Sequence, residues 1–167
     1  MKKITKKVTL SLLAMVALGT QSYAEEISKP WYVGVGLTTG IASDTYCEDI
    51  TYGVMLQTGY KVHENVALEF RAVKTNWEYE GGKIEHYGVF VKPNYPLAKD
   101  VNLYALLGYG KTTLSKQANI DETGLAYGAG STYSLGEYEL FLDYEHLISN
   151  SDIPSIDALS LGVAFSF

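Results

Sequence analysis

The sequence predicts an all-β protein, an eight-stranded antiparallel up-and-down transmembrane β-barrel. Large apolar residues alternate with small or polar ones over eight runs of about ten residues. The links between these runs alternate between short and long. After residue 25 no stretch is apolar for the roughly 20 residues that a membrane-spanning helix requires. The alternation therefore indicates strands, not helices, as the membrane-crossing elements.

The first 24 residues are predicted to be a cleaved secretory signal peptide. Four lysines among residues 2–7 precede the apolar stretch Val8–Gly19, and Ser22-Tyr23-Ala24 forms a small-x-small cleavage site. An uncleaved anchor or a buried core helix is the alternative for this segment. We expect residues 1–24 to be removed and residues 25–167 to form the barrel domain. Removing four of the 13 Lys+Arg leaves 9 against 19 Asp+Glu, a net charge of −10. Such an acidic chain argues against a nucleic-acid partner, because phosphate binding needs clustered Lys and Arg.

Each run has one face of large apolar residues and one face that combines glycine with charged side chains. The apolar faces lie within 31–37, 52–60, 66–72, 87–95, 101–109, 125–133, 138–144 and 159–167. Eight strands enclose an interior just wide enough for side chains, which the bulky set would overfill. The apolar face is therefore predicted to point outward to lipid. A soluble barrel or sandwich, the alternative, would bury the apolar face.

The outward aromatic residues are predicted to form two rows. One row contains Trp31, Tyr60, Tyr95, Tyr133, Tyr138, Phe165 and Phe167, and the other contains Tyr52, Tyr87, Tyr109, Tyr127 and Tyr144. Tyr52 and Tyr60 are eight residues apart in one run, which corresponds to roughly 20 Å along the barrel axis. This spacing is close to the ~25 Å apolar band of outer-membrane barrels, which has an aromatic girdle at each interface.

The lengths of the links predict the topology. The short links are Lys61–Asn65, Pro96–Asp100 and Ser134–Gly136, and the longer polar links are Thr39–Ile50, Lys74–Lys83, Thr112–Glu122 and Ser149–Pro154. Outer-membrane barrels have short periplasmic turns and longer extracellular loops. With the N-terminus in the periplasm, every long link falls outside the cell.

Over essentially residues 30–167, the chain resembles the small outer-membrane barrels of the opacity-protein and OmpA/OmpX-like families. The most specific part is the alternation of Leu159, Leu161, Val163, Phe165 and Phe167. This end resembles the signal that the outer-membrane assembly machinery recognises. The resemblance implies the outer membrane of a Gram-negative bacterium, with membrane lipid, lipopolysaccharide and that machinery as partners. Family members include adhesins, serum-resistance factors, scaffold barrels and porin-like proteins.

The interior is the first candidate site. The inward faces carry a predicted lumen charge network of Glu69, Arg71, Lys92, Glu139, Asp143 and Glu145, with His86 and Tyr104 on the same faces. Charges in a narrow interior must be paired or hydrated, because an isolated buried ion costs several kcal/mol. The network either locks the barrel or lines a narrow polar passage. Four carboxylates against two cations would make such a passage favour cations.

The long links are the second candidate site, since loops on a rigid scaffold commonly carry binding. The interaction candidates, which would meet an unknown host or surface ligand, are Asp44, Glu48, Asp49, Trp77 and Tyr79. Simple solubilising loops are the alternative, and the two aromatics could instead belong to the outer girdle. The three acidic residues lack the ligand spacing of a calcium loop.

We predict no catalytic residue, no cofactor and no metal. His146 and Ser149 resemble the pair of the lipid A deacylase barrels, whose His and Ser lie two apart on one strand. Here they are three apart, which places them on opposite faces of a regular strand, although a β-bulge could restore the match. Cys47 is the only cysteine, so no intramolecular disulfide can form.

The leading hypothesis is a non-enzymatic outer-membrane barrel that serves envelope integrity or surface interaction through its extracellular loops. A small cation-favouring porin is the alternative, and a lipid A-modifying enzyme is the third candidate.

Overall fold

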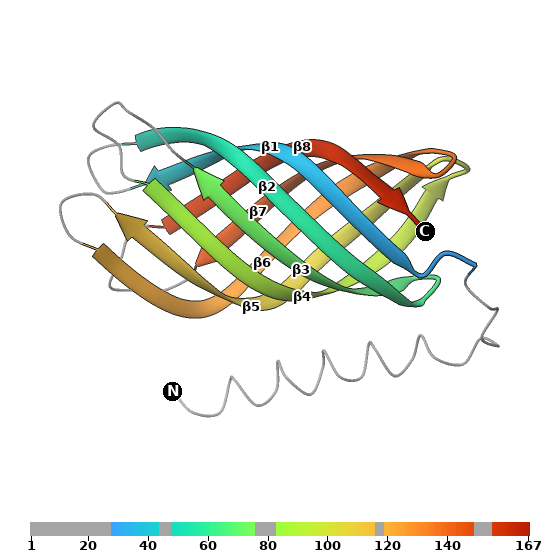
Figure 1. Ribbon diagram of the computed structural model, residues 1–167, viewed down its shortest axis with the longest axis horizontal. Helices are drawn as coiled ribbons and strands as arrows, with labels where there is room; N and C mark the ends of the chain where they lie inside the picture. The colour runs from blue at the N-terminus through green and yellow to red at the C-terminus, as the bar shows by residue number, and fades with distance from the viewer. Residues whose placement is uncertain (1–27, 44–47, 76–82, 116–118, 149–154) are drawn as a thin grey trace.

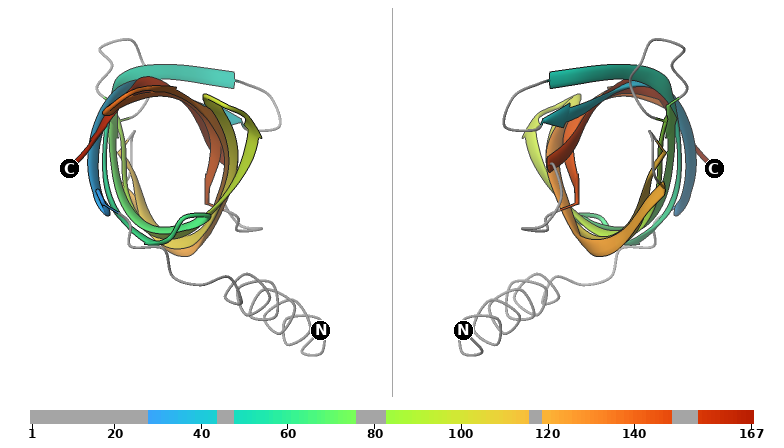
Figure 2. Two further views of the ribbon diagram at one scale, coloured as in Figure 1. Left: turned by 90° about the vertical axis from the view of Figure 1, so that its right-hand side faces the viewer. Right: turned by 90° about the vertical axis from the view of Figure 1, so that its left-hand side faces the viewer.

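The computed structural model describes residues 28–43, 48–75, 83–115, 119–148 and 155–167, which contain eight strands and no helix. The strands are β1 Trp31–Ser43, β2 Glu48–His63, β3 Val66–Thr75, β4 Lys83–Ala98, β5 Val101–Ser115, β6 Asn119–Leu135, β7 Tyr138–Ile148 and β8 Ser155–Ser166. Each strand pairs antiparallel with the next, and β1 pairs with β8, so the sheet closes into a barrel (Figure 1, Figure 2). The predicted fold class is confirmed. Among the described residues, no helix is long and apolar enough to cross a membrane.

The closing seam joins the two ends of the described chain. The Trp31 amide donates to the Phe167 carbonyl at 3.3 Å, and the Phe167 amide donates to the Trp31 carbonyl at 2.9 Å. The ladder between β1 and β8 continues from Tyr32 opposite Ser166. A closed ladder has no edge strand, so it satisfies the backbone within hydrocarbon, where water is not available as a partner.

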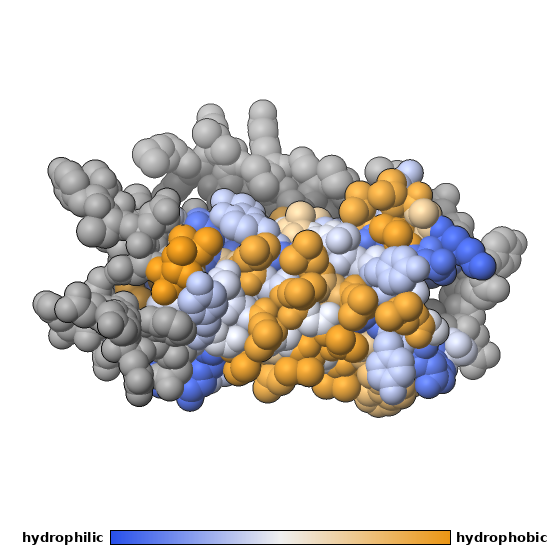
Figure 3. Space-filling model, turned by 90° about the horizontal axis from the view of Figure 1, so that it is seen from above, coloured by the Kyte–Doolittle hydropathy of each residue, from blue (hydrophilic) through white to orange (hydrophobic). Residues whose placement is uncertain are grey.

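The large apolar side chains lie on the outside of this barrel, as predicted. On β8, Leu161 is 60% exposed, whereas the inward-facing Ser160 beside it is 2% exposed. In Figure 3 hydrophobic side chains cover the middle of the visible wall, and hydrophilic ones lie towards its ends. A soluble barrel has the opposite arrangement, so the wall is suited to lipid.

The predicted aromatic residues also lie on the outer wall. The exposed tyrosines of this set are Tyr52, Tyr60, Tyr87, Tyr95, Tyr109, Tyr127, Tyr133, Tyr138 and Tyr144. At one end of the barrel the rings of Trp31 and Tyr60 are 4.9 Å apart between centroids, and those of Tyr138 and Phe165 are 5.3 Å apart. These contacts link neighbouring strands at the level of one predicted girdle.

The two ends of the barrel differ. The turn end carries the tight connections before β3, β5 and β7, including Gly136, whose positive φ of 76° suits a residue without a Cβ. The loop end is the opposite one, where β1, β3, β5 and β7 end and β2, β4, β6 and β8 begin. The link predicted over Ser149–Pro154 lies outside the described residues, which end at Ile148 on β7 and resume at Ser155 on β8.

Two of the predicted long links are largely wrong. Most of Thr39–Ile50 belongs to β1 and β2, and most of Thr112–Glu122 belongs to β5 and β6. β6, the longest strand, has 17 residues, about six more than the ~9–11 that cross a bilayer. Beyond the bilayer the backbone ladder continues while both faces can meet water. The side-chain alternation that reveals a strand inside the membrane is then lost.

Candidate functional site: the filled lumen

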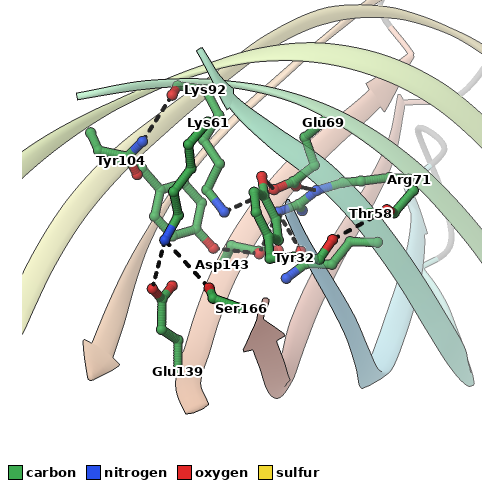
Figure 4. Close-up of polar contacts among 12 residues, drawn as sticks. Tyr32, Thr58, Lys61, Glu69, Arg71, Lys92, Tyr104, Glu139, Asp143 and Ser166 are labelled. Carbon is green, nitrogen blue, oxygen red and sulfur yellow. Dashed lines mark hydrogen bonds and ion pairs between the residues drawn. The ribbon is translucent and has the colours of Figure 1, made fainter. Parts of the chain in front are cut away.

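A cluster of ion pairs crosses the lumen at its middle. Arg71 on β3 is fully buried, and its guanidinium donates to Glu69 through Nε, to Glu145 Oε2 at 3.1 Å through Nη1 and to Asp143 Oδ2 at 3.0 Å through Nη2. The last two carboxylates belong to β7, four strands from β3 around the ring of eight. Arg71 therefore reaches across the barrel to the opposite wall (Figure 4).

Lys92 extends this cluster towards the turn end. Its ammonium donates to Glu69 Oε2 at 2.9 Å and lies 4.2 Å from the centroid of the Tyr104 ring. The Tyr104 hydroxyl donates to Asp143 Oδ2 at 2.6 Å, and the Tyr32 hydroxyl donates to Glu69. We call Glu69, Arg71, Lys92, Asp143 and Glu145 the ionic plug; each member is at most 5% exposed.

Local sequence places these groups on the inward face. Glu69 and Arg71 are two residues apart on β3, so both point inward, and Asp143 and Glu145 share the same relation on β7. Gly130 on β6 is the ladder partner of Asp143 on β7, and its lack of a side chain leaves room for Asp143 and Tyr104. A Cβ added to Gly130 would lie 2.5 Å from the Asp143 Cβ and 2.6 Å from the Tyr104 ring. A larger residue at this position would displace the plug.

The loop end of the lumen is closed by apolar side chains. Ile84, Leu147, Ile156 and Ala158 are buried together, and we call them the apolar seal. Ile84 on β4 reaches across the lumen to β1, three strands away, because a Cβ added to Gly40 on β1 would lie 2.8 Å from the Ile84 Cδ1. Leu147 lies at an irregularity in the ladder, where β7 has one residue more than β8. An ion passing this layer would lose its hydration without gaining polar contacts.

The turn end of the lumen is open by contrast. A polar cavity of about 90 Å³, the vestibule, is lined by residues that include Tyr32, Lys61, Lys92, Asn102 and Glu139. Lys61 Nζ lies 3.4 Å from both Glu139 Oε1 and Ser166 Oγ (Figure 4). The vestibule borders the plug, because its lining includes the plug member Lys92 and Tyr32, which donates to Glu69. The described lumen is therefore filled at the loop end and open at the turn end.

The structure divides the six predicted network residues into two groups. Five form the ionic plug, whereas Glu139 lies at the mouth and pairs with Lys61, a residue outside the predicted network. Glu139 is separated from Asp143 by one inward-facing position, which moves it about 13 Å along β7. Three inward-facing polar residues were missing from the prediction, namely Tyr32, Gln57 and Lys61. Each is an even number of residues from an inward-facing glycine, Gly34 or Gly59, and this spacing could have identified them.

His86 lies between the plug and the apolar seal. It is fully buried on β4, and its Nδ1 lies 2.8 Å from Thr112 Oγ1. Its Nε2 is 3.7 Å from Glu145 Oε1. Among the described residues, His86 Nε2, Asp143 Oδ1 and Glu145 Oε1 are buried atoms without a hydrogen-bond partner.

The loop candidates are only partly described. Asp44, Trp77 and Tyr79, together with Cys47, lie outside the described residues. Glu48 and Asp49 were predicted to lie in a loop, but β2 begins at Glu48 and its ladder with β1 includes both. Their placement in a loop was wrong, because strands that continue beyond the bilayer lose the side-chain alternation by which a strand is recognised. Their role in binding stays a prediction.

Of the residues considered for enzyme and assembly roles, those that the structure describes lie on the outward face of their strands. His146 lies against Asp157, with Nδ1 and Oδ1 2.6 Å apart, and its ring centroid is 4.9 Å from that of Tyr127. Ser149 lies outside the described residues. The final residues Leu161, Val163 and Phe167 are exposed and Phe165 is half-buried on β8. Their recognition by the assembly machinery stays a prediction.

Several solved structures share this architecture. The attachment invasion locus protein Ail of Yersinia pestis, solved with the heparin analogue sucrose octasulfate, aligns with a TM-score of 0.65 and 21% identity over 84% of this chain and 100% of that one. Neisserial surface protein A gives a TM-score of 0.63 and 16% identity, over 82% and 97% of the two chains. OprG of Pseudomonas aeruginosa gives 0.58 and 13%, over 83% and 96%. At these identities the likeness concerns the fold.

Comparison with curated proteins gives no match. The family model for the outer membrane protein β-barrel domain matches residues 10–167. This match spans nearly the whole sequence and agrees with the lipid-facing wall and the closed ladder. The chain is a multi-pass β-barrel of the bacterial outer membrane and belongs to the outer membrane protein β-barrel family.

Proposed function

We propose that this protein is a non-enzymatic, non-conducting outer-membrane barrel that serves envelope integrity or surface interaction through its loop end. The observation that carries the proposal is the double closure of the lumen. Arg71 spans the barrel within the ionic plug, and the apolar seal lies beyond it. Because the middle and the loop end of the described lumen are filled, we infer that contacts outside the cell are made by the surface at the loop end.

The names of two proteins with similar structures support a role in surface interaction. One is an attachment invasion locus protein solved with a heparin analogue, and another is a surface protein. We propose by analogy that this chain presents its loop end to a ligand outside the cell. The short turns would then lie in the periplasm, as in other outer-membrane barrels.

The first experiment measures ion conductance. Residues 25–167 are refolded into a planar lipid bilayer, after protease resistance and heat-dependent gel migration show that the barrel is folded. We expect no steady current, because an ion would meet the paired charges of the plug and then the apolar seal. Stable cation-selective steps from the folded barrel would instead support the small porin and contradict the proposal.

The second experiment measures binding. Bacteria that display the protein are tested for adhesion to host-type cells and to immobilised heparin. We expect the Trp77→Ala, Tyr79→Ala double variant to lose binding, with Tyr95→Ala as the matched control because Tyr95 is an exposed aromatic towards the turn end. Equal binding by both variants would exclude the two aromatics as the contact. Unchanged lipid A mass with and without the protein would remove the enzyme candidate.

A further inference from the structure

The ionic plug contains more negative than positive groups. Its members are three carboxylates, Glu69, Asp143 and Glu145, and two cations, Arg71 and Lys92, which gives a formal charge of −1 (2 − 3). All five are at most 5% exposed. An uncompensated charge at such a position costs several kcal/mol, so the buried cluster favours a state that holds one more positive charge.

The hydrogen bonds restrict where that charge can reside. Glu69 is contacted by Arg71, Lys92 and Tyr32, so both of its oxygens accept hydrogen bonds. Asp143 Oδ2 accepts from both Arg71 and Tyr104. Of the three carboxylates, Glu145 receives the fewest contacts: Oε2 accepts from Arg71, and Oε1 has no partner among the described residues.

His86 completes the arrangement. The Thr112 hydroxyl donates to the Leu147 carbonyl at 3.4 Å, so its oxygen accepts from His86 Nδ1–H at 2.8 Å. The other ring nitrogen, Nε2, then faces Glu145 Oε1 at 3.7 Å, and both atoms are buried without a partner among the described residues. Two facing acceptors become a donor and an acceptor when a single proton is added between them.

We propose that the plug binds one proton at a site formed by His86 Nε2 and Glu145 Oε1, and that this proton neutralises the barrel interior at neutral pH. The proton is held either as an imidazolium facing a carboxylate or as a carboxylic acid facing a neutral imidazole. Both forms give the buried cluster a net charge of zero. The inference rests on the geometry of the plug and does not depend on what the loop end binds.

The groups on every neighbouring element are compatible with this site. β1 and β2 contribute Tyr32 and Gln57, which hydrogen-bond within the plug, and β5 contributes Tyr104 and Thr112. β6 places Gly128 and β8 places Ala158 opposite Glu145, and the next inward residue of β8 towards the turn end, Ser160, is also neutral. The carboxylate of the half-buried Glu122 lies on β6 opposite Thr112, towards the loop end.

The test compares stability between pH 7 and pH 9. Unfolding by urea is followed in detergent micelles for the wild type and for Glu145→Gln. In this range the folded wild type holds one proton more than the unfolded chain, because free Glu and His are both deprotonated. Stability therefore falls as the pH rises, and the unfolding equilibrium constant should increase about tenfold per pH unit relative to Glu145→Gln. In that variant the remaining charges cancel, so the extra proton is no longer needed.

Glu85→Gln is the matched control. This variant is also a glutamate-to-glutamine change, but Glu85 lies on β4, its side chain is 26% exposed, and it pairs with Lys83 at 2.6 Å and Lys74 at 3.2 Å. We expect Glu85→Gln to keep the pH dependence of the wild type. Equal pH dependence in the wild type and Glu145→Gln would overturn the proposal. Cys47 is present in all three chains, so its titration cancels in the comparison.

A second measurement needs no plug variant. Infrared spectra of the wild type at pH 7.5 report the carbonyl stretch of a buried carboxylic acid, and ¹⁵N NMR reports the charge of the His86 imidazole. We expect one of the two signals, which shows where the proton lies. Absence of both signals, or presence of both, overturns the proposal.

The two proposals fail separately. A barrel that is electrically silent but has no proton at His86 and Glu145 contradicts the proton site and leaves the proposed function. A barrel that conducts but shows the tenfold dependence contradicts the proposed function and leaves the proton site.

Discussion

The two closures of the lumen use opposite chemistry. At the loop end the apolar seal brings together Ile84, Leu147, Ile156 and Ala158, whereas at mid-height the ionic plug joins five charged groups. Removing atoms from the seal leaves a small cavity. Removing one partner from the plug leaves unpaired charges in a region without bulk water. The comparison teaches that two regions with similar burial can tolerate change very differently.

The largest expected effect is the loss of the central cation. Arg71→Met leaves Asp143 and Glu145 without their cation, and we expect a loss of about 3–5 kcal/mol in the free energy of unfolding. Urea unfolding in detergent micelles measures it. Combining Arg71→Met with Asp143→Asn and Glu145→Gln should recover much of the loss, because the two unpaired carboxylates are then gone while Glu69 and Lys92 remain paired. A loss below about 1 kcal/mol for the single variant would mean that water screens the plug.

The apolar seal should respond next. Leu147→Ala removes a fully buried side chain, and we expect a loss of about 2–4 kcal/mol from lost burial and cavity formation. Conductance should stay absent in this variant, because the plug still crosses the lumen. Current from folded Leu147→Ala would show that the seal alone blocks ions and that the plug leaks.

A smaller effect is expected from a single hydroxyl. Tyr104→Phe removes the donor to Asp143 Oδ2 but keeps the ring beside Lys92. Because this hydrogen bond has a charged acceptor, we expect a loss of about 1.5–3 kcal/mol. Tyr109→Phe is the matched control, since Tyr109 is an outward, 58% exposed tyrosine on the same strand. Similar losses in both variants would contradict a specific role for the buried hydroxyl.

The smallest effect is expected at the surface. Lys111 Nζ lies 3.1 Å from Asp121 Oδ2, and both side chains are about half exposed, at 53% and 54%. An exposed ion pair gains little in water and is screened by salt. We expect Lys111→Gln to leave the urea midpoint unchanged at moderate salt. A clear shift in that midpoint would mean that the ladder beyond the bilayer contributes more than its exposure suggests.

Prediction from the sequence was most successful where the information is local. The alternation of Leu159 to Phe167 identified both the strand and its outward face, because side chains alternate with a period of two in any strand. The same parity placed Arg71 and Glu145 inside the barrel. It failed for the boundaries of the links near Thr39 and Thr112, since strands that extend into water need no apolar face.

The sequence by itself determined the number of strands, the lipid-facing side of each and the set of charges available to the interior. Only the tertiary structure decided which of those charges meet. Asp143 and Glu145 contact Arg71 across 72 and 74 residues of chain, whereas Glu139, on the same face of the same strand, joins Lys61 at the mouth. The reason is that the direction of a side chain follows from its own strand. Its height in the lumen and its partner on the opposite wall depend on the register of all eight strands and on the closure of β1 onto β8.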